Sequence, residues 1–145
     1  YFEGEVLYPF GYGLSYSDFE YSDLRLEKTR ITAGEPVHLS VRVRNTGSLA
    51  GDEVVQVYLR DEAATAPVPF RSLVGFKRLH LLPQEEEKLL FTVAPKQLSM
   101  IDNHDQRVIE PGWFTVAVGG RQPQTNQLQQ AIRGDILLTR FQVLR

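Results

Sequence analysis

A period of two in hydrophobicity runs through most of this chain and constrains its fold more than any other feature. In residues 37–44 the apolar residues Val37, Leu39, Val41 and Val43 alternate with polar ones. Successive side chains of a β-strand point to opposite faces of its sheet, so this alternation is typical of a half-buried strand. The same pattern predicts further strands over residues 19–26, 54–59, 73–82, 89–93, 113–118 and 136–143.

Turn-forming residues separate these segments, as in Asn45-Thr46-Gly47-Ser48 and Pro111-Gly112. About seven or eight short strands with turn signals every 8–12 residues are typical of an antiparallel β-sandwich of the immunoglobulin or fibronectin type III-like kind. A β-barrel is the alternative for the same pattern. We expect an all-β sandwich over residues 19–145, with a helical turn at 95–99 and a bulge at Gly75.

The first 18 residues have a different character, which predicts an arm that docks on another surface. Residues 8–16 read Tyr-Pro-Phe-Gly-Tyr-Gly-Leu-Ser-Tyr, with four aromatic residues and two glycines. Each aromatic ring brings roughly 150–250 Å² of surface that favours burial. The glycines suit a bent backbone. The sequence therefore predicts an interdomain arm over residues 1–18, with an interface made by Tyr8, Phe10, Tyr12 and Tyr16.

Composition excludes several classes of function. The chain has 145 residues, a net charge of −2 and no cysteine. The charge favours neither nucleic acid nor an anionic membrane as a partner, and no apolar run approaches the roughly 20 residues that span a bilayer. Disulfides, thiolate metal sites and cysteine catalysis are excluded. Because the only methionine is Met100, we expect this sequence to be either a processed chain or a piece of a larger protein.

The ionisable residues suggest neither a catalytic pair nor a metal or cofactor site. A retaining glycosidase needs two carboxyl groups roughly 5 Å apart. The acidic groups at 61–62, 85–87 and 102–105 are best explained as charged turns and strand ends. The histidines, His38, His80 and His104, lie on separate predicted elements and lack metal-ligand spacing.

Two groups of residues are candidates for binding sugar. The long loop after residue 61 ends in Phe70 and Arg71, and stiff loops on a rigid sandwich are a usual place for binding residues. Packing within the domain competes with sugar stacking as the role of the aromatic side chains. The aromatic candidates for a stacking platform are Tyr58, Phe70, Phe76 and Trp113.

The arm and several later segments together resemble the C-terminal fibronectin type III-like domain of family 3 glycoside hydrolases. After the arm, the resemblance rests on Val-Arg-Asn-Thr-Gly at 43–47 and Gly-Asp-Glu-Val-Val-Gln-Val-Tyr-Leu-Arg-Asp at 51–61. It continues with Leu-Val-Gly-Phe-Lys-Arg-Leu-His-Leu at 73–81 and Glu-Pro-Gly-Trp-Phe-Thr-Val-Ala-Val-Gly-Gly at 110–120. The glutamine-rich segment after Arg121 departs from the family pattern.

The resemblance implies a non-catalytic accessory domain that stabilises the catalytic domains of the same polypeptide and can lend a loop to the active-site rim. In that family the nucleophilic aspartate and the acid/base residue belong to other domains, so no catalytic role transfers to any position here. The parent enzyme would hydrolyse terminal β-linked sugars, as a β-glucosidase or β-xylosidase. An extracellular or periplasmic location is favoured for it, and the cytoplasm is the alternative. The alternatives are a stand-alone carbohydrate-binding or adhesion module and a homodimerisation module.

Overall fold

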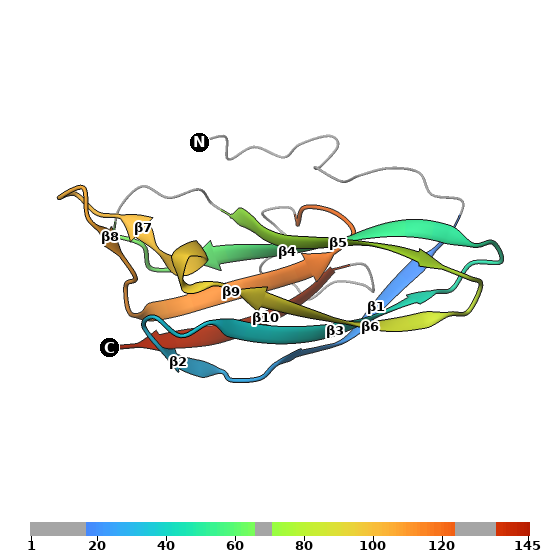
Figure 1. Ribbon diagram of the computed structural model, residues 1–145, viewed down its shortest axis with the longest axis horizontal. Coiled ribbons are helices and arrows are strands. Elements are labelled where there is room, and N and C mark those ends of the chain that lie inside the picture. The colour runs from blue at the N-terminus through green and yellow to red at the C-terminus, as the bar shows by residue number, and fades with distance from the viewer. Residues whose placement is uncertain (1–16, 66–70, 124–135) are drawn as a thin grey trace.

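The computed structural model describes residues 17–65, 71–123 and 136–145, and these residues form a β-sandwich (Figure 1). Tyr8, Phe10, Tyr12, Tyr16, Phe70 and most of the glutamine-rich segment lie outside the described residues. The elements are β1 (Phe19–Leu26), β2 (Arg30–Thr32), β3 (Val37–Asn45), β4 (Gly51–Asp61), β5 (Ser72–Leu81), β6 (Glu86–Val93), the 3₁₀-helix η1 (Pro95–Leu98), β7 (Met100–Ile101), β8 (Arg107–Val108), β9 (Gly112–Gly119) and β10 (Ile136–Leu144).

Two sheets form the layers of the sandwich, which confirms the predicted fold class. The smaller sheet, called sheet A, has the strand order β1-β3-β6. The larger, called sheet B, has the order β2-β10-β9-β4-β5, and β7 pairs with β8 in a separate two-stranded ribbon. The chain crosses between the layers several times: β3, for example, lies in sheet A and β4 in sheet B.

Apolar side chains at every second position of the strands form the core between the two sheets. From β3, the side chains of Val37, Leu39, Val41 and Val43 are all buried, as their spacing predicted. The rings of Phe114 on β9 and Phe141 on β10 stack with centroids 5.3 Å apart. Apolar burial of this kind is the main favourable contribution to folding. The remaining core residues, drawn from both sheets, include Val55, Val57, Leu59, Leu79, Leu81, Leu89, Val93, Val116 and Val118.

The irregular elements follow local signals. Pro95 begins η1, as proline can at a helix start, and residues 102–105 turn the chain between β7 and β8. A register shift beside Gly75 confirms the bulge expected there. The strand β2 was not predicted, because three residues carry too little periodicity. It pairs in parallel with β10, an exception in an otherwise antiparallel sandwich.

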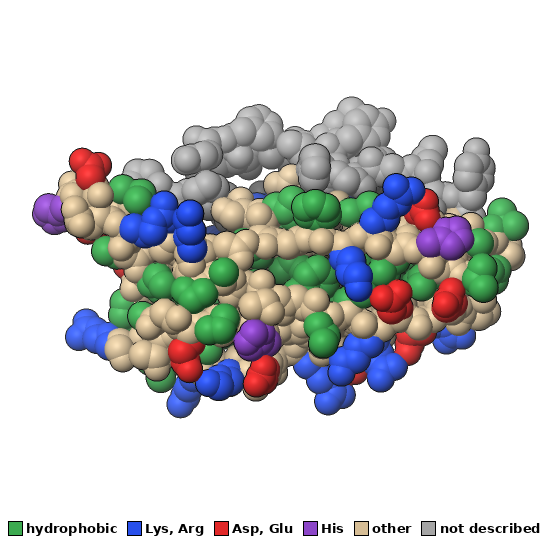
Figure 2. All heavy atoms as spheres, viewed as in Figure 1, with side chains coloured by type: hydrophobic (Ala, Val, Ile, Leu, Met, Phe, Trp, Pro, Cys, Tyr) green, Lys and Arg blue, Asp and Glu red, His purple; other side chains and the backbone are tan. Residues whose placement is uncertain are grey.

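The two outer faces of the sandwich differ in chemistry. On sheet A the outward side chains are mostly charged, and Arg42 pairs with both Glu86 (2.6 Å) and Asp23 (3.3 Å). Figure 2 shows basic and acidic side chains interspersed along the lower edge of the molecule, where β2 and β3 lie. Charged side chains of this kind are usually exposed to solvent. On sheet B, by contrast, the outward side chains of Gln56, Tyr58 and Ala117 are buried.

Candidate domain interface

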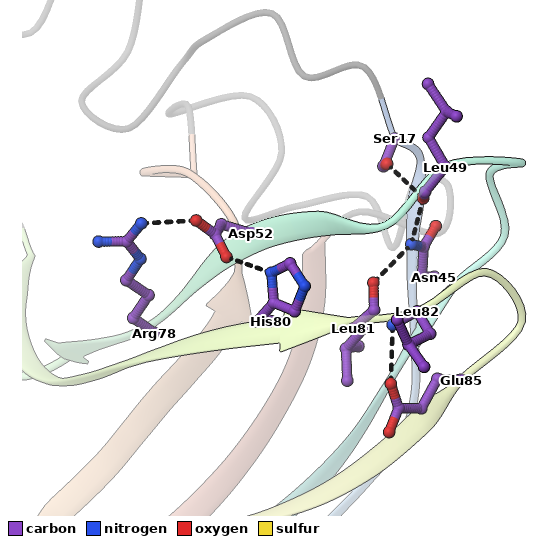
Figure 3. A network of polar contacts seen from close by, with 9 residues as sticks. All are labelled: Ser17, Asn45, Leu49, Asp52, Arg78, His80, Leu81, Leu82 and Glu85. Carbon is purple, nitrogen blue, oxygen red and sulfur yellow. Dashed lines mark hydrogen bonds and ion pairs between the residues drawn. The ribbon is translucent and has the colours of Figure 1, made fainter.

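Ser17 and Asp18, the first residues that the structure describes, are held against the sandwich by hydrogen bonds. The Ser17 hydroxyl donates to the Leu49 carbonyl at 2.8 Å (Figure 3). The Thr46 amide donates to the Asp18 carbonyl at 2.8 Å, and the Thr46 hydroxyl donates to the same oxygen at 3.2 Å. We call this group, together with Asn45, the N-terminal clasp. It holds residues 17–18 against the connection between β3 and β4.

Asn45 is the centre of the clasp and is fully buried. Its amide nitrogen donates to the carbonyls of Leu49 (2.8 Å) and Leu81 (3.0 Å), and its amide oxygen accepts from the Gly47 amide (2.9 Å). The side chain therefore joins the end of β3 in sheet A to the end of β5 in sheet B. A buried amide with every polar atom bonded stabilises this end of the sandwich.

Two glycines make room for the clasp. A Cβ on Gly51 would lie 2.7 Å from the Ser17 hydroxyl oxygen, and one on Gly47 would lie 3.1 Å from the Asp18 amide nitrogen. The backbone can approach this closely only where no side chain intervenes. The Asn-Thr-Gly and Gly-Asp segments singled out in the sequence thus serve one purpose, since both pack against residues 17 and 18.

A half-buried carboxylate lies on the inner side of β4. Glu53 accepts a hydrogen bond from the Val54 amide at 2.8 Å and also interacts with the Tyr21 side chain of β1. Burial raises the pKa of Glu53 above its ordinary value, and these hydrogen bonds oppose that shift only in part. The contact with Tyr21 links sheet B to sheet A.

A charged cluster lies on the outer side of β4 and β5. Asp52 pairs with Arg78 at 2.5 Å and with the His80 ring at 2.8 Å (Figure 3). The hydrogen bond from Arg78, followed by that from His80, lowers the pKa of the Asp52 carboxyl. All three side chains are well exposed, so this cluster contributes little to stability.

The first residues of the long loop after β4 are hydrogen-bonded to neighbouring strands. The Glu62 amide donates to the Trp113 carbonyl at 3.1 Å, and its carboxylate accepts from the Thr115 hydroxyl and, at 2.8 Å, from Arg140. The Thr65 amide donates to Glu110 at 3.0 Å. The described start of the loop is therefore bound to β9 and β10.

Arg71, the described member of the predicted sugar-binding pair, lies where the chain returns to β5. It is half-buried, and burial together with the nearby Arg60 lowers the pKa of its guanidinium. Burial raises the pKa of the Tyr58 hydroxyl close by. Phe70 lies outside the described residues, so a binding role for Phe70 and Arg71 stays a prediction.

The predicted aromatic platform is not assembled in the part of the chain that the structure describes. The Tyr58 ring is buried, and its hydroxyl donates to Gln56 at 2.6 Å, so it offers no free face to a sugar. Trp113 is exposed at the other end of sheet B, where the Arg140 guanidinium lies 4.9 Å from its ring centroid. Phe76 is exposed on β5.

The three histidines lie on separate elements, as the sequence predicted. His38 and His80 are exposed strand residues, and His104 is exposed in the turn between β7 and β8. Among residues 17–65, 71–123 and 136–145, no three histidine or acidic side chains gather in a group that could hold a metal ion. None of these residues forms a helix with the length and apolar composition needed to cross a bilayer.

Sequence reasoning missed the clasp and the burial of the outer face of sheet B. Asn45 was interpreted as a turn residue, because no local pattern reveals its bond to Leu81, 36 positions away. The burial did leave a signal: residues 54–59 are apolar at almost every position instead of alternating. Such a run is typical of a strand covered on both faces.

Comparison with known proteins shows which family has this architecture. Residues 53–122 match the sequence model of the fibronectin type III-like domain. A β-xylosidase of Formosa agariphila is 42% identical over 113 residues, which cover 78% of this chain and 16% of that protein. Thermostable β-glucosidase B of Acetivibrio thermocellus is 34% identical over 130 residues, or 89% of this chain and 17% of that protein.

Solved structures agree with the sequence matches. The β-glucosidase of Listeria innocua in complex with glucose superposes with a TM-score of 0.82 at 32% identity, over 96% of this chain and 18% of that one. β-Glucosidase 3B of Thermotoga neapolitana in complex with α-D-glucose gives 0.79 at 34% identity, over 97% and 18%. This chain is a fibronectin type III-like domain of the kind that family 3 glycoside hydrolases carry. It spans about a sixth of the length of these relatives.

Proposed function

We propose that this fibronectin type III-like domain is a non-catalytic part of a β-glycosidase and that it stabilises the catalytic domains of the same polypeptide. The observation that carries the proposal is the N-terminal clasp. Hydrogen bonds at Ser17 and Asp18 hold the chain against the β3–β4 connection. A segment that leaves the sandwich from a fixed point keeps a preceding domain at a defined position, whereas a loose linker would not.

The chemistry of the described residues supports an accessory role. Many of the described acidic side chains pair with basic ones or cap turns, as Asp102 does by accepting from the amides of His104 (2.8 Å) and Gln106 (2.9 Å). Hydrolysis of a glycoside needs a nucleophilic or basic carboxylate facing an acid across the bond. Such a pair would come from other domains of the parent protein.

The experiment compares the isolated 145-residue chain with its parent polypeptide on aryl β-glucosides and aryl β-xylosides. We expect hydrolysis by the parent and none by the isolated chain. Hydrolysis by the isolated chain that disappears with Asp102→Asn or Asp105→Asn would contradict the proposal, because it would place catalytic carboxylates in this domain.

A second role, at the rim of the parent's active site, is favoured by the surroundings of Arg71. A partly desolvated guanidinium forms stronger hydrogen bonds with hydroxyls or carboxylates than one in water. The test is the double change Phe70→Ala and Arg71→Ala in the parent enzyme. A rise in KM for longer oligosaccharides, with an unchanged melting temperature, supports the rim role, whereas a fall in melting temperature alone assigns the loop a structural role.

A further inference from the structure

One end of the outer face of sheet B carries an exposed tryptophan beside polar side chains. Trp113 on β9 pairs in register with Gln142 on β10, and Gln142 pairs with Arg30 on β2. The next pair along, Val143 and Ile31, is buried in the core between the sheets. Because successive side chains of a strand alternate between faces, Gln142 and Arg30 point outward, as Trp113 does. Three adjacent strands thus contribute one row of side chains (Figure 1).

A second row of side chains lies next to the first on the same face. Arg140 on β10 pairs in register with Thr115 on β9, each two positions from a member of the first row. The Glu62 carboxylate accepts from the Thr115 hydroxyl and, at 2.8 Å, from Arg140. The two rows and this carboxylate make up what we call the Trp113 strip: Arg30, Glu62, Trp113, Thr115, Arg140 and Gln142.

The tryptophan of the strip is both accessible and held in place. Trp113 is 42% exposed, whereas the Tyr58 ring on the same face of sheet B is 5% exposed. The Arg140 guanidinium lies 4.9 Å from the Trp113 ring centroid and is itself held by Glu62. A cation over an aromatic face is attracted to it, so each side chain restrains the other. Side chains restrained before binding lose less conformational freedom when a ligand arrives.

The chemistry of the strip suits a neutral sugar. An indole offers an apolar surface to the C–H groups of a pyranose ring, while guanidinium and amide groups donate hydrogen bonds to its hydroxyls and a carboxylate accepts them. Because Arg140 is paired with Glu62, the two charges beside Trp113 balance. The row from Trp113 to Arg30 spans three strands, roughly 10 Å, which gives room for an extended chain of more than one sugar unit.

We propose that the Trp113 strip binds a neutral, extended β-linked oligosaccharide, with Trp113 packing on a sugar ring and Arg140, Gln142 and Arg30 donating to its hydroxyls. This site is separate from the predicted pair Phe70 and Arg71, because it lies on β9, β10 and β2. The choice of a β-linked chain rests on the proposed function, but the site itself does not. A domain that only stabilises its neighbours would need no such site.

The experiment titrates the 145-residue chain with cellohexaose, xylohexaose and, as an α-linked comparison, maltohexaose. Trp113 is the only tryptophan of the chain, so its fluorescence reports on the strip alone, and amide signals in NMR spectra give the affinity of variants that lack it. The variants are Trp113→Ala and Gln142→Ala. The matched control is Phe76→Ala, an exposed aromatic on the same face whose row crosses β9 at Gly119, roughly 20 Å from Trp113.

We expect a saturable change in Trp113 fluorescence with cellohexaose or xylohexaose, and weaker binding by about tenfold in Trp113→Ala. Gln142→Ala should also weaken binding, which keeps the test decisive if Trp113→Ala folds poorly, and Phe76→Ala should leave it unchanged. The proposal is overturned if neither β-linked sugar binds at up to about 10 mM, if maltohexaose binds equally well, or if both strip variants bind as the natural chain does. Hydrolysis by the parent polypeptide is measured separately, so failure of this proposal leaves the proposed function standing.

Discussion

At the scale of single residues, a few buried polar groups determine how the two sheets meet. Asn45 joins the ends of β3 and β5, and Glu53 joins β4 to Tyr21 on β1. Both lie where one sheet is connected to the other, so each bond links the two layers. Buried polar groups are costly when they lose their partners, and their contribution can therefore be measured by substitution.

Asn45→Ala is expected to lower the free energy of unfolding by about 2–4 kcal/mol, because the buried Leu81 carbonyl and the Gly47 amide lose their partner. Denaturant unfolding of the 145-residue chain measures this change. The control is Asn103→Ala in the exposed turn between β7 and β8, where we expect a change within about 0.5 kcal/mol. Equal effects of the two substitutions would show that Asn45 has no special role.

Glu53 gives a pH dependence of defined sign. Burial raises the pKa of its carboxyl in the folded state above the ordinary value of 4.5. The favourable contribution of Glu53 to the free energy of unfolding is therefore complete below pH 4.5. It is lost as the pH rises through the folded-state pKa of this carboxyl. We expect Glu53→Gln to remove this loss. The free energy of unfolding of the variant, relative to that of the natural chain, should therefore increase from pH 4 to pH 7. Glu20→Gln, the same substitution at an exposed position on β1, is the control with which the effect of Glu53→Gln is compared.

At the scale of elements, the clasp fixes the start of β1 by packing it against two glycine-containing turns. The contact depends on space more than on strong interactions, because a Cβ on Gly51 would overlap the Ser17 side chain. In a close-packed region an added methyl group forces neighbouring atoms to move. The element most affected would be the chain before Phe19.

Gly51→Ala is expected to cost about 1–3 kcal/mol and to release residues 17–18 from the clasp. Hydrogen exchange of the Thr46 amide, which donates to Asp18, should become faster than that of the β3 amides. Gly112→Ala is the matched control, because its added Cβ would meet the Ala63 Cβ at 3.6 Å, an ordinary contact. Unchanged protection of Thr46 in Gly51→Ala would mean that the clasp does not depend on this glycine.

The elements also show which parts of the fold the sequence could predict. Strict alternation in β3 identified the strand and its buried face, because one side of sheet A faces water and the other the core. In β4 the pattern was ambiguous, since Gln56 and Tyr58 point away from the core between the sheets and are nevertheless buried. The short strand β2 and its parallel pairing with β10 depend on contacts distant in sequence. No local pattern encodes them.

At the scale of the whole molecule, the two outer faces of the sandwich differ in chemistry. Sheet A presents paired charges, and sheet B presents an apolar patch flanked by the Asp52–Arg78–His80 cluster. The exposed apolar side chains of Phe76 and Leu73 lie on this outer face of sheet B. This difference between the two faces left one sign in the sequence, the nearly continuous apolar run at residues 54–59.

The central claim, that this domain is structurally coupled to the catalytic part of a glycosidase, is tested most directly by calorimetry of the parent polypeptide. If the domains are coupled, the parent unfolds in one transition, and Asn45→Ala lowers both its midpoint and the temperature at which hydrolysis is lost, while KM stays unchanged. A separate, earlier transition for this domain, shifted by Asn45→Ala while the loss of activity stays at its original temperature, would contradict the claim.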